Sequence, residues 1–539
     1  MADAAAIAFR LNALKASRSP HETVWRDCFD YTFPLRADGF QTTTLNAQSG
    51  QERLARLVDG TGTDAARILS SGIISGATPA NSLWFQLGVA GATDLETRWL
   101  EGAAQTLFEQ IHGSNYDSQA YECALDLVCA GWFALYIEEN KEEGGFTFEQ
   151  WPLSQVYGAS TKRGGVVDIV YREFELTAEQ AVAEYGDGSK GEGVSTQTLK
   201  LVKDKPDEFV NFVHAIYPRL DGKQGSILAK HLPIASCHVE IKAKKLVREG
   251  GYHEMPVIMP RWHKLPRSVY AVGPANDALP DMRCLNELKR MMLQAADMAA
   301  TGMYKAVDDG VLNPRNIKVG ARKVITVGDI NSIEPLTSGA DFNISFTLEE
   351  HLQATIRKTF MADQLQPQDG PQMTATEVHV RVGLIRQLLG PVYGRMQAEW
   401  LAKMIQRCFG VGVRSGMLKD APVSLNGRAY QVRYISPLAR AQRQEEVTAM
   451  DQFELALAQQ AQIEGPRALD IYDSDEARRE RAHLLGVPAK LILSEEDLAA
   501  LRTARAKAQQ DAGEQQAQAR GQQAFADSAG DAAGKSLVQ

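Results

Sequence analysis

Two long amphipathic helical patterns, separated by a short β-rich segment, restrict most strongly how this 539-residue chain can fold. In residues 274–303, apolar side chains recur at steps of three and four residues, the period of one helix face: Leu285, Leu288, Met292, Ala295 and Ala299. Pro280 suits the first turn of this helix. The second pattern covers residues 348–364, and the 304–345 segment between them contains short β-prone runs and Gly and Pro turns. The sequence therefore predicts a two-helix stalk with a small module at its far end.

A polar loop, residues 365–373, leads into a third long helical pattern. Thr374 as N-cap and Glu377 three residues later form a capping box. Gly390 and Pro391 lie inside the pattern, and because proline lacks a backbone donor we expect a kink there. One apolar stripe continues through the whole pattern: Val378, Val382, Ile385, Leu389, Val392, Met396, Trp400, Met404 and Cys408.

The remaining segments divide into helical and β-rich parts. Residues 63–76 and 121–139 predict helices, the second leading into a strand, and Trp84 and Phe85 between them are interpreted as packing anchors. Short β-prone runs over residues 144–262 predict an antiparallel sheet, with one helix inserted at a capping box over residues 177–180. After residue 444 the chain is helical and polar. This order of parts predicts an α+β protein.

Composition limits the environment and the partners. Hydrophobic residues make up 44% of the chain and charged residues 23%, so most of it should fold. No apolar run reaches the length of a membrane span and no secretory signal is present, so we expect a protein made and kept in the cytosol or in something assembled there. Six scattered cysteines without a CxxC pair predict reduced, mostly buried thiols. A net charge of −9 predicts only loose contact with nucleic acid.

No motif for catalysis or cofactor binding is complete. The Gly-rich stretch at residues 59–69 lacks the lysine of a phosphate-binding loop, and a second stretch at 186–193 lacks the following helix. His253 and Glu254 begin like a zinc-peptidase motif without its second histidine. A basic cluster is interpreted as a solvated strand face in preference to a nucleic-acid patch: Lys242, Lys244, Lys245 and Arg248. We therefore expect no enzyme, no metal site and no cofactor.

The order of these parts resembles a bacteriophage portal protein, the head-to-tail connector of short-tailed, T7-like phages. Four local segments carry the resemblance in addition to the order: RDCFDYTFPLR, SSGIISGATPANSLWFQL, SNYDSQAYECALDLVCAGWFALYIEE and ISPLARAQR. It extends from about residue 9 to about residue 505. The implied fold is an α+β portal fold with an α/β wing, a helical stem, a small α/β clip and a helical crown, assembled as a ring.

The resemblance implies a boundary for each part of the chain. These are a wing over residues 1–273, a stem helix over 274–303, a clip over 304–345, a returning stem helix over 346–364, a channel loop over 365–373, a long kinked wing helix with its following segment over 374–430, a helical crown over 431–505 and an Ala/Gln/Gly-rich tail over 506–539 that is flexible or conditionally helical.

The implied function is a ring-shaped channel, usually of twelve subunits, at one capsid vertex of the virion. Double-stranded DNA is packaged through it by a separate terminase motor and later ejected, which explains why the chain lacks a nucleotide-binding motif. The implied partners are the terminase large subunit, a tail adaptor protein, the major capsid and scaffolding proteins and internal core proteins. Assembly is expected in the host cytoplasm, and no membrane span is implied.

The resemblance also places residues. The channel loop would present polar side chains without positive charge to the DNA, and could act as a valve, through Gln366, Gln368, Asp369, Gly370 and Gln372. The kink at Gly390 and Pro391 would be coupled to this loop. Stem contacts within or between subunits would come from Leu285, Leu288, Met292, Leu352 and Ile356. In the clip, contacts with DNA or a partner protein would come from Arg315, Lys318, Arg322 and Lys323.

Two other classes of protein remain open at this point. A phage assembly enzyme such as a terminase or nuclease would require nucleotide hydrolysis or a carboxylate metal site, and the missing phosphate-binding loop argues against the first. A plain interaction scaffold or capsid subunit would not build a narrow central pore. Enzyme assays and particle symmetry separate these alternatives from a portal.

Overall fold

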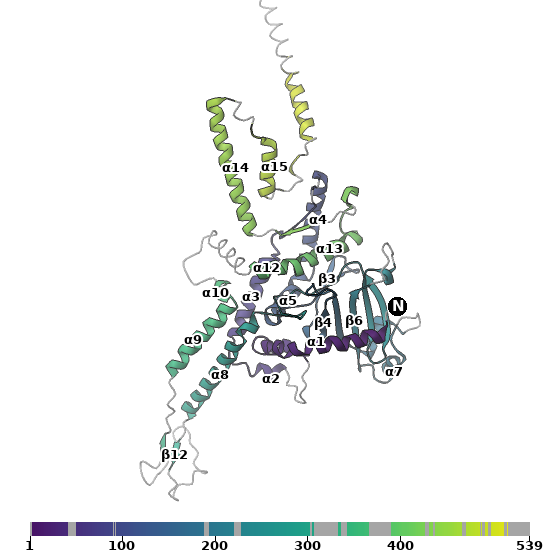
Figure 1. Cartoon of the computed structure of the whole chain (residues 1–539), viewed down its shortest axis with the longest axis vertical. Helices are drawn as coiled ribbons and strands as arrows, with labels where there is room; N and C mark the ends of the chain where they lie inside the picture. Colours follow the sequence, from purple (N-terminus) through teal and green to yellow (C-terminus); the bar gives the residue numbers. More distant parts are fainter. Residues whose placement is uncertain are drawn as a thin grey trace, which may run out of the picture. The chain divides into compact units, whose positions relative to one another are not determined.

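The computed structural model describes most of the chain, and the described residues form two compact units. They are residues 3–40, 50–89, 91, 93–187, 193–219, 228–301, 304–306, 333–335, 342–365, 390–425, 431–434, 437–465, 471–485, 487, 491–493, 497–510, 512 and 515. Unit 1 comprises Met1–Trp84 and Gln105–Asp420, and unit 2 comprises Phe85–Ala104 and Ala421–Gln539. Both helices and sheets are present, so the α+β class predicted from sequence is confirmed (Figure 1).

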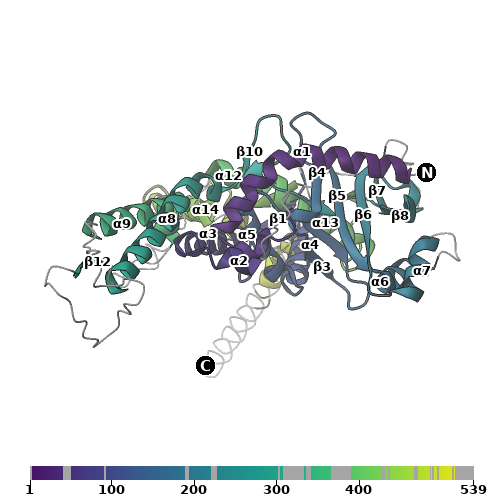
Figure 2. The same cartoon turned by 90° about the horizontal axis from the view of Figure 1, so that it is seen from below.

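An antiparallel five-stranded sheet lies in unit 1, as the sequence predicts. The strands neighbour one another in chain order: β4 (Val156–Ala159), β5 (Ile169–Thr177), β6 (Phe209–Pro218), β7 (Ile234–Glu240) and β8 (Lys245–Tyr252). The long helix α1 (Ala4–Asp30) crosses this sheet (Figure 2). Its buried Ile7, Leu11 and Leu14 pack in one apolar cluster with Val213 and Val239 of the sheet. This burial fixes α1 as the cover of one sheet face.

The run CHVEIKAKKLV, expected as one strand, is two strands joined by a turn. β7 ends at Glu240 and β8 begins at Lys245, and Lys244 in the turn has φ of 46°. The prediction was wrong because apolar and polar residues alternate across the turn without a glycine to mark it. Of the basic cluster, Lys242 and Lys244 are exposed, whereas the Lys245 ammonium donates to the Val194 carbonyl at 2.8 Å.

A second sheet and a buried helix complete the core of unit 1. Helix α5 (Tyr116–Ala130) runs into β2 (Leu135–Glu139), which confirms the helix-to-strand prediction for this stretch. β2 pairs with β3 (Phe146–Gln150) and β9 (Val257–Ile258). Shorter elements connect these parts: η1 (Pro34–Ala37), α2 (Gly50–Leu54), α3 (Thr61–Ala77), η2 (Leu153–Gln155), α7 (Thr196–Asp204), η3 (Ala229–His231), β10 (His263–Lys264) and β11 (Ala271–Val272).

Glycine is required where α5 turns into β2. Gly131 has φ of +83°, a conformation that side chains disfavour, and a Cβ atom there would collide with the backbone of Val272 and Gly273. Gly131→Ala is therefore expected to lower the free energy of unfolding by about 1–3 kcal/mol more than Gly144→Ala. Gly144 is the matched control because its φ is +78° and its surroundings are open within 4 Å. Urea denaturation of both variants measures the difference; equal midpoints would contradict the expectation.

The inserted helix α6 (Ala178–Tyr185) begins as the sequence predicts. The Thr177 side chain accepts a hydrogen bond from the Gln180 amide, and the Gln180 side chain accepts one from the Thr177 amide, which completes a capping box. The helix ends at Gly186, where φ is +83°. The local sequence thus sets both ends of α6.

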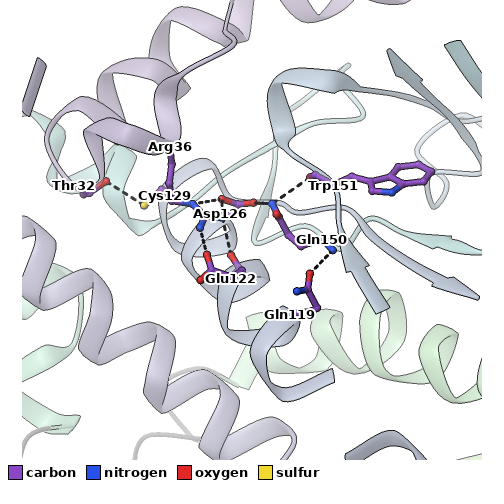
Figure 3. A network of polar contacts seen from close by, with 8 residues as sticks. All are labelled: Thr32, Arg36, Gln119, Glu122, Asp126, Cys129, Gln150 and Trp151. Carbon is purple, nitrogen blue, oxygen red and sulfur yellow. Dashed lines mark hydrogen bonds and ion pairs between the residues drawn. The ribbon is translucent and has the colours of Figure 1, made fainter. Parts of the chain in front are cut away.

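A buried polar network joins η1, α5 and β3 (Figure 3). The Arg36 guanidinium donates to the Asp126 carboxylate at 2.7 and 3.0 Å and also pairs with Glu122. The amide of Gln150 donates to the Gln119 side chain at 2.8 Å, and the Gln150 side chain donates to Asp126. Burial raises the pKa of Asp126, and Arg36 opposes this shift. Only Asp126 is fully buried, whereas Arg36 and Glu122 keep part of their surface exposed, so the network joins the three elements from the buried Asp126 outward.

Two histidines on neighbouring strands, His214 on β6 and His238 on β7, stack on each other. The rings of His214 and His238 have centroids 3.9 Å apart. His214 Nε2 lies 2.9 Å from Ser236 Oγ, and His238 Nδ1 lies 2.9 Å from the Tyr185 hydroxyl. Burial, with the nearby arginines, lowers the pKa of His238 to about 3, and burial also lowers the pKa of His214 well below its usual value. Both rings are therefore neutral in the folded protein at pH 7.

This pair predicts a loss of stability in acid. Between pH 6.5 and about 3 the unfolded chain binds more protons than the folded one at these sites, so stability falls as pH falls. From pH 6.5 to 4.5, His238 contributes a loss of about 2 kcal/mol, and His214 contributes in the same direction. We expect His238→Phe to lose about 2 kcal/mol less than the parent chain over this range. Urea midpoints at pH 7.5, 6.5, 5.5 and 4.5 test this, and identical pH profiles would refute it.

Unit 2 is mainly helical, with one strand pair. β1 (Phe85–Gly88) pairs antiparallel with β14 (Gln431–Tyr434). Helices α14 (Pro437–Glu464) and α15 (Ser474–Leu485) follow, and residues 497–510 are helical. Residues 431–434, at the start of the segment assigned to the helical crown, form a strand because they find a distant partner at residues 85–88 that local propensity does not reveal. Helix α4 (Asp94–His112) spans the boundary between the two units, and η6 (Val423–Leu425) belongs to unit 2.

Candidate functional site

Two antiparallel helices, α8 (Pro274–Thr301) and α9 (Phe342–Thr359), form the most distinctive surface of unit 1 (Figures 1 and 2). They pack along each other as the sequence predicts. Leu285, Leu352 and Ile356 are buried, and Leu288 and Met292 are half-buried. Three of the five predicted stem-contact residues are thus covered within a single copy of the chain, and two keep part of their surface open.

Two details of these helices differ from the prediction. α8 begins at Pro274, so Pro280 lies inside the helix and not in its first turn. α9 ends at Thr359, and the short helix α10 (Ala362–Leu365) follows after Met361, whose φ is 56°. The apolar pattern continues through this break, which is why the sequence predicted one uninterrupted returning helix.

A charged network fixes the hairpin to the start of α3. The Lys289 ammonium on α8 lies 2.9 Å from the Asp59 carboxylate and 3.0 Å from the Glu349 carboxylate on α9. Burial raises the pKa of Asp59, but hydrogen bonds from Lys289 and Thr61 outweigh it, so the pKa of Asp59 is lowered overall. The hydrogen bond to Asp59 in turn raises the pKa of Lys289. Asp59 and Lys289 are thus both charged at neutral pH, and the network ties both helices to one point.

Asn286 adds a neutral anchor beside this network. Its side-chain oxygen accepts from the Val58 amide at 2.7 Å and the Asp59 amide at 3.3 Å, and its nitrogen donates to the Arg56 carbonyl at 3.2 Å. Because each group of the amide is engaged, the orientation of α8 on the segment before α3 is fixed. Sequence patterning missed Asn286 and Lys289, since Val58 and Asp59, to which they bind, lie more than 200 residues away in the chain.

The hairpin exposes large apolar side chains away from its own packing seam. The exposed fractions are 55% for Met291, 57% for Leu293, 53% for Phe346 and 43% for Leu348. We call these four residues the hairpin apolar surface. Single exposed apolar residues are ordinary on a protein surface, but here each helix exposes two of them, and because the two are two positions apart they face different sides of the hairpin. Met291 and Leu293 do not belong to the predicted apolar stripe of this helix. Large apolar residues outside the stripe are expected to be exposed, and this could have identified the two residues from the sequence.

At the far end of the hairpin, β12 (Tyr304–Ala306) pairs antiparallel with β13 (Ile333–Pro335). The rest of the predicted clip lies outside the described residues, including Arg315, Lys318, Arg322 and Lys323. The predicted channel-loop residues also lie outside them: Gln366, Gln368, Asp369, Gly370 and Gln372. These assignments stay predictions.

The predicted hinge residues mark the start of a described helix. α12 (Gly390–Met396) begins at Gly390, and the residues before it are outside the described part, so the kink at Gly390 and Pro391 stays a prediction. The described irregularity lies further on, in a π-helical turn (Gln397–Leu401) before α13 (Ala402–Arg414). Within the described range the predicted apolar stripe is confirmed, since all its members are buried: Val392, Met396, Trp400, Met404 and Cys408.

Potential metal ligands and cysteines are dispersed over the described residues. No cluster of three or more metal-ligating side chains occurs among them. Each cysteine is unpaired, and five are buried while Cys284 is exposed, as predicted. Glu254 lies in a loop and pairs with Arg414 at 2.6 Å and Arg407 at 3.2 Å. Among the helices described, none combines the length and the apolar character needed to span a bilayer.

An anchored hairpin with an exposed apolar surface is typical of a structural assembly subunit, and comparison with known proteins identifies the family. The family model of the bacteriophage head to tail connecting protein matches residues 4–493. The portal protein of Salmonella phage epsilon15 is 28% identical over 535 residues, covering 96% of this chain and 93% of that protein. The probable portal protein of Bordetella phage BPP-1 is 28% identical over 533 residues, covering 93% of this chain and 91% of that protein.

Among solved structures, a chain from the neck of an empty GTA particle, computed with C6 symmetry, covers 80% of this chain and 90% of its own length. The sequence identity is 12% and the TM-score is 0.36, a likeness too weak to support an argument. The family model, in contrast, spans most of the sequence. The chain belongs to the family of bacteriophage head to tail connecting proteins, as its sequence resemblance predicted. Its function is that of a phage portal, the channel at a capsid vertex.

Proposed function

We propose that the chain closes into a ring of identical subunits, most simply of twelve, with α8 and α9 lining the ring as its stem. The hairpin apolar surface supports this proposal, because a ring buries the same four side chains of every copy against a neighbour. Leu288 and Met292, which are half-buried in one copy, would contribute to the same contact. The network of Lys289, Asp59 and Glu349 would hold each hairpin at one angle to its body, so that all subunits present the surface identically.

The parts of the chain would then take the roles of portal subdomains. Residues 1–273 and 374–430 would form the wing, residues 274–303 and 346–364 the stem, residues 304–345 the clip, residues 365–373 a loop facing the channel, and residues 431–505 a crown. The clip would face the terminase large subunit during packaging and the tail adaptor protein afterwards. The wing and crown would face the major capsid, scaffolding and internal core proteins.

Viral double-stranded DNA would pass through the ring in both directions without being held. The chain carries 67 acidic and 58 basic residues, and this net negative charge would favour loose over tight contact with the phosphate groups. We propose that the chain is not an enzyme and that the motor is a separate protein. The ring would assemble in the host cytoplasm and remain in the virion at the portal vertex.

Electron microscopy of the purified chain, with native mass measurement, tests this proposal. A ring of one rotational symmetry with an open axial channel is the expected result, and the mass gives the number of copies. A closed oligomer without a channel would overturn the portal assignment of the hairpin and favour a plain scaffold. Assays for Mg²⁺-dependent ATP hydrolysis and nuclease activity on the same preparation test the alternative of a packaging enzyme.

A further inference from the structure

The helix that runs from Gly390 to Arg414 contains one turn that is wound differently from the rest. In the π-helical turn Gln397–Leu401, the Ala402 amide donates to the Gln397 carbonyl, five residues back, instead of four. Such a turn holds one extra residue, and π-turns occur often at functional sites. One residue corresponds to about 100° of rotation and about 1.5 Å of rise in an α-helix. The turn therefore sets how α12 is rotated relative to α13.

A buried ion pair grips the helix at the middle of this turn. The Glu399 carboxylate accepts two hydrogen bonds from the Arg261 guanidinium, at 2.6 and 2.9 Å, and both side chains are buried. Arg261 also donates to the Gly165 carbonyl at 3.1 Å. One turn earlier in the helix, Arg395 donates to the carbonyl of Trp262. Two consecutive residues, Arg261 and Trp262, thus contact the helix at the middle of the π-turn and one turn before it.

The same place contains polar groups that the present arrangement leaves unpaired. The indole N–H groups of Trp400 and Trp132 are buried and have no hydrogen-bond acceptor among the described residues. Trp400 packs edge-on against Phe133, with ring centroids 5.2 Å apart, and Trp132 forms a β-bridge with Arg261. An unpaired buried N–H is costly. Two unpaired buried donors therefore lie beside the π-turn, one of them within it, and the Arg261–Glu399 pair is the buried charged contact at the same place.

We propose that the ion pair between Arg261 and Glu399 holds this helix in one of two registers, and that opening the pair switches the helix to the other. With the pair closed, the extra residue stays in the turn and α12 keeps its present rotation. With the pair open, the helix absorbs or moves the extra residue, and α12 turns about its own axis relative to α13. The switch is a property of unit 1 and is independent of the number of subunits in a ring, so its failure would leave the proposed function intact.

Hydrogen exchange with mass spectrometry on the full chain tests this switch. In Glu399→Gln, whose side chain keeps the shape but loses the charge, we expect amide exchange in residues 396–404 to rise at least tenfold, with exchange in β5–β8 unchanged. Arg261→Lys keeps the charge but not the two-pronged geometry, and we expect a smaller rise over the same residues. It is the second variant if Glu399→Gln does not fold.

Glu254→Gln is the matched control. Glu254 also pairs with arginines of this helix, Arg407 and Arg414, but beyond the π-turn. We expect it to leave exchange in residues 396–404 at the parental level. Three results would each overturn the proposal: parental exchange in Glu399→Gln, an equal rise in both glutamine variants, or a rise that spreads through the five-stranded sheet. In each case the Arg261–Glu399 pair would not specifically control the register of the π-turn.

Discussion

Replacing Arg18 with methionine is expected to lower the free energy of unfolding by about 3–5 kcal/mol, the range for removing one partner of a buried charged network. Arg18 is fully buried on α1 and donates to the carbonyls of Leu153, Ser154 and Val156 at 2.8–2.9 Å. It also pairs with Glu22 at 2.6 Å. The substitution leaves three carbonyls and one carboxylate without their donor, and the bonds to the Leu153 and Val156 carbonyls are buried.

The matched control for this prediction is Arg10→Met on the same helix, because Arg10 is exposed. It should change stability by less than about 0.5 kcal/mol, as is usual for surface substitutions. Urea denaturation followed by circular dichroism measures both variants. If Arg18→Met and Arg10→Met unfold at the same urea concentration, the carbonyl cluster contributes nothing to the docking of α1.

The double variant Met291→Asp and Leu293→Asp is expected to abolish ring assembly while the chain stays folded. Both side chains are more than half exposed in one copy, so the substitutions cost little in the isolated chain. In a ring they would place two carboxylates of every copy in an apolar contact, which costs several kcal/mol per interface. We expect at least a ~100-fold weaker association, equivalent to about 2.8 kcal/mol.

Native mass measurement and electron microscopy of this double variant show the outcome directly. Phe9→Asp is the control, since Phe9 is a more exposed apolar side chain on α1, away from the hairpin. Rings should persist in Phe9→Asp and disappear in the double variant. Intact rings in the double variant would mean that another surface of the chain carries assembly, and the hairpin would lose its proposed role as the stem.

Local sequence patterns predicted the elements that depend on neighbours in the chain. The capping box at Thr177 and Gln180, the helix-to-strand passage before Gly131 and the buried stripe from Val392 to Cys408 all follow from spacing and residue type. Trp84 and Phe85 are buried, as expected of packing anchors. Patterns failed where they continue through a break, as at Lys244 and Met361, since a left-handed residue other than glycine leaves no mark on hydrophobic periodicity.

The sequence by itself determined the α+β fold class, the order of most helices and strands and the protein family. Hydrophobic periodicity, helix caps and short family-specific segments all depend on residues that are close together in the chain. Only the tertiary structure decided which charged side chains are buried and what they hold. Arg261 meets Glu399 across 138 positions, and Lys289 meets Asp59 across 230. Such pairs depend on how the fold brings distant segments together, and burial then makes them strong by removing water. No local pattern encodes that distance.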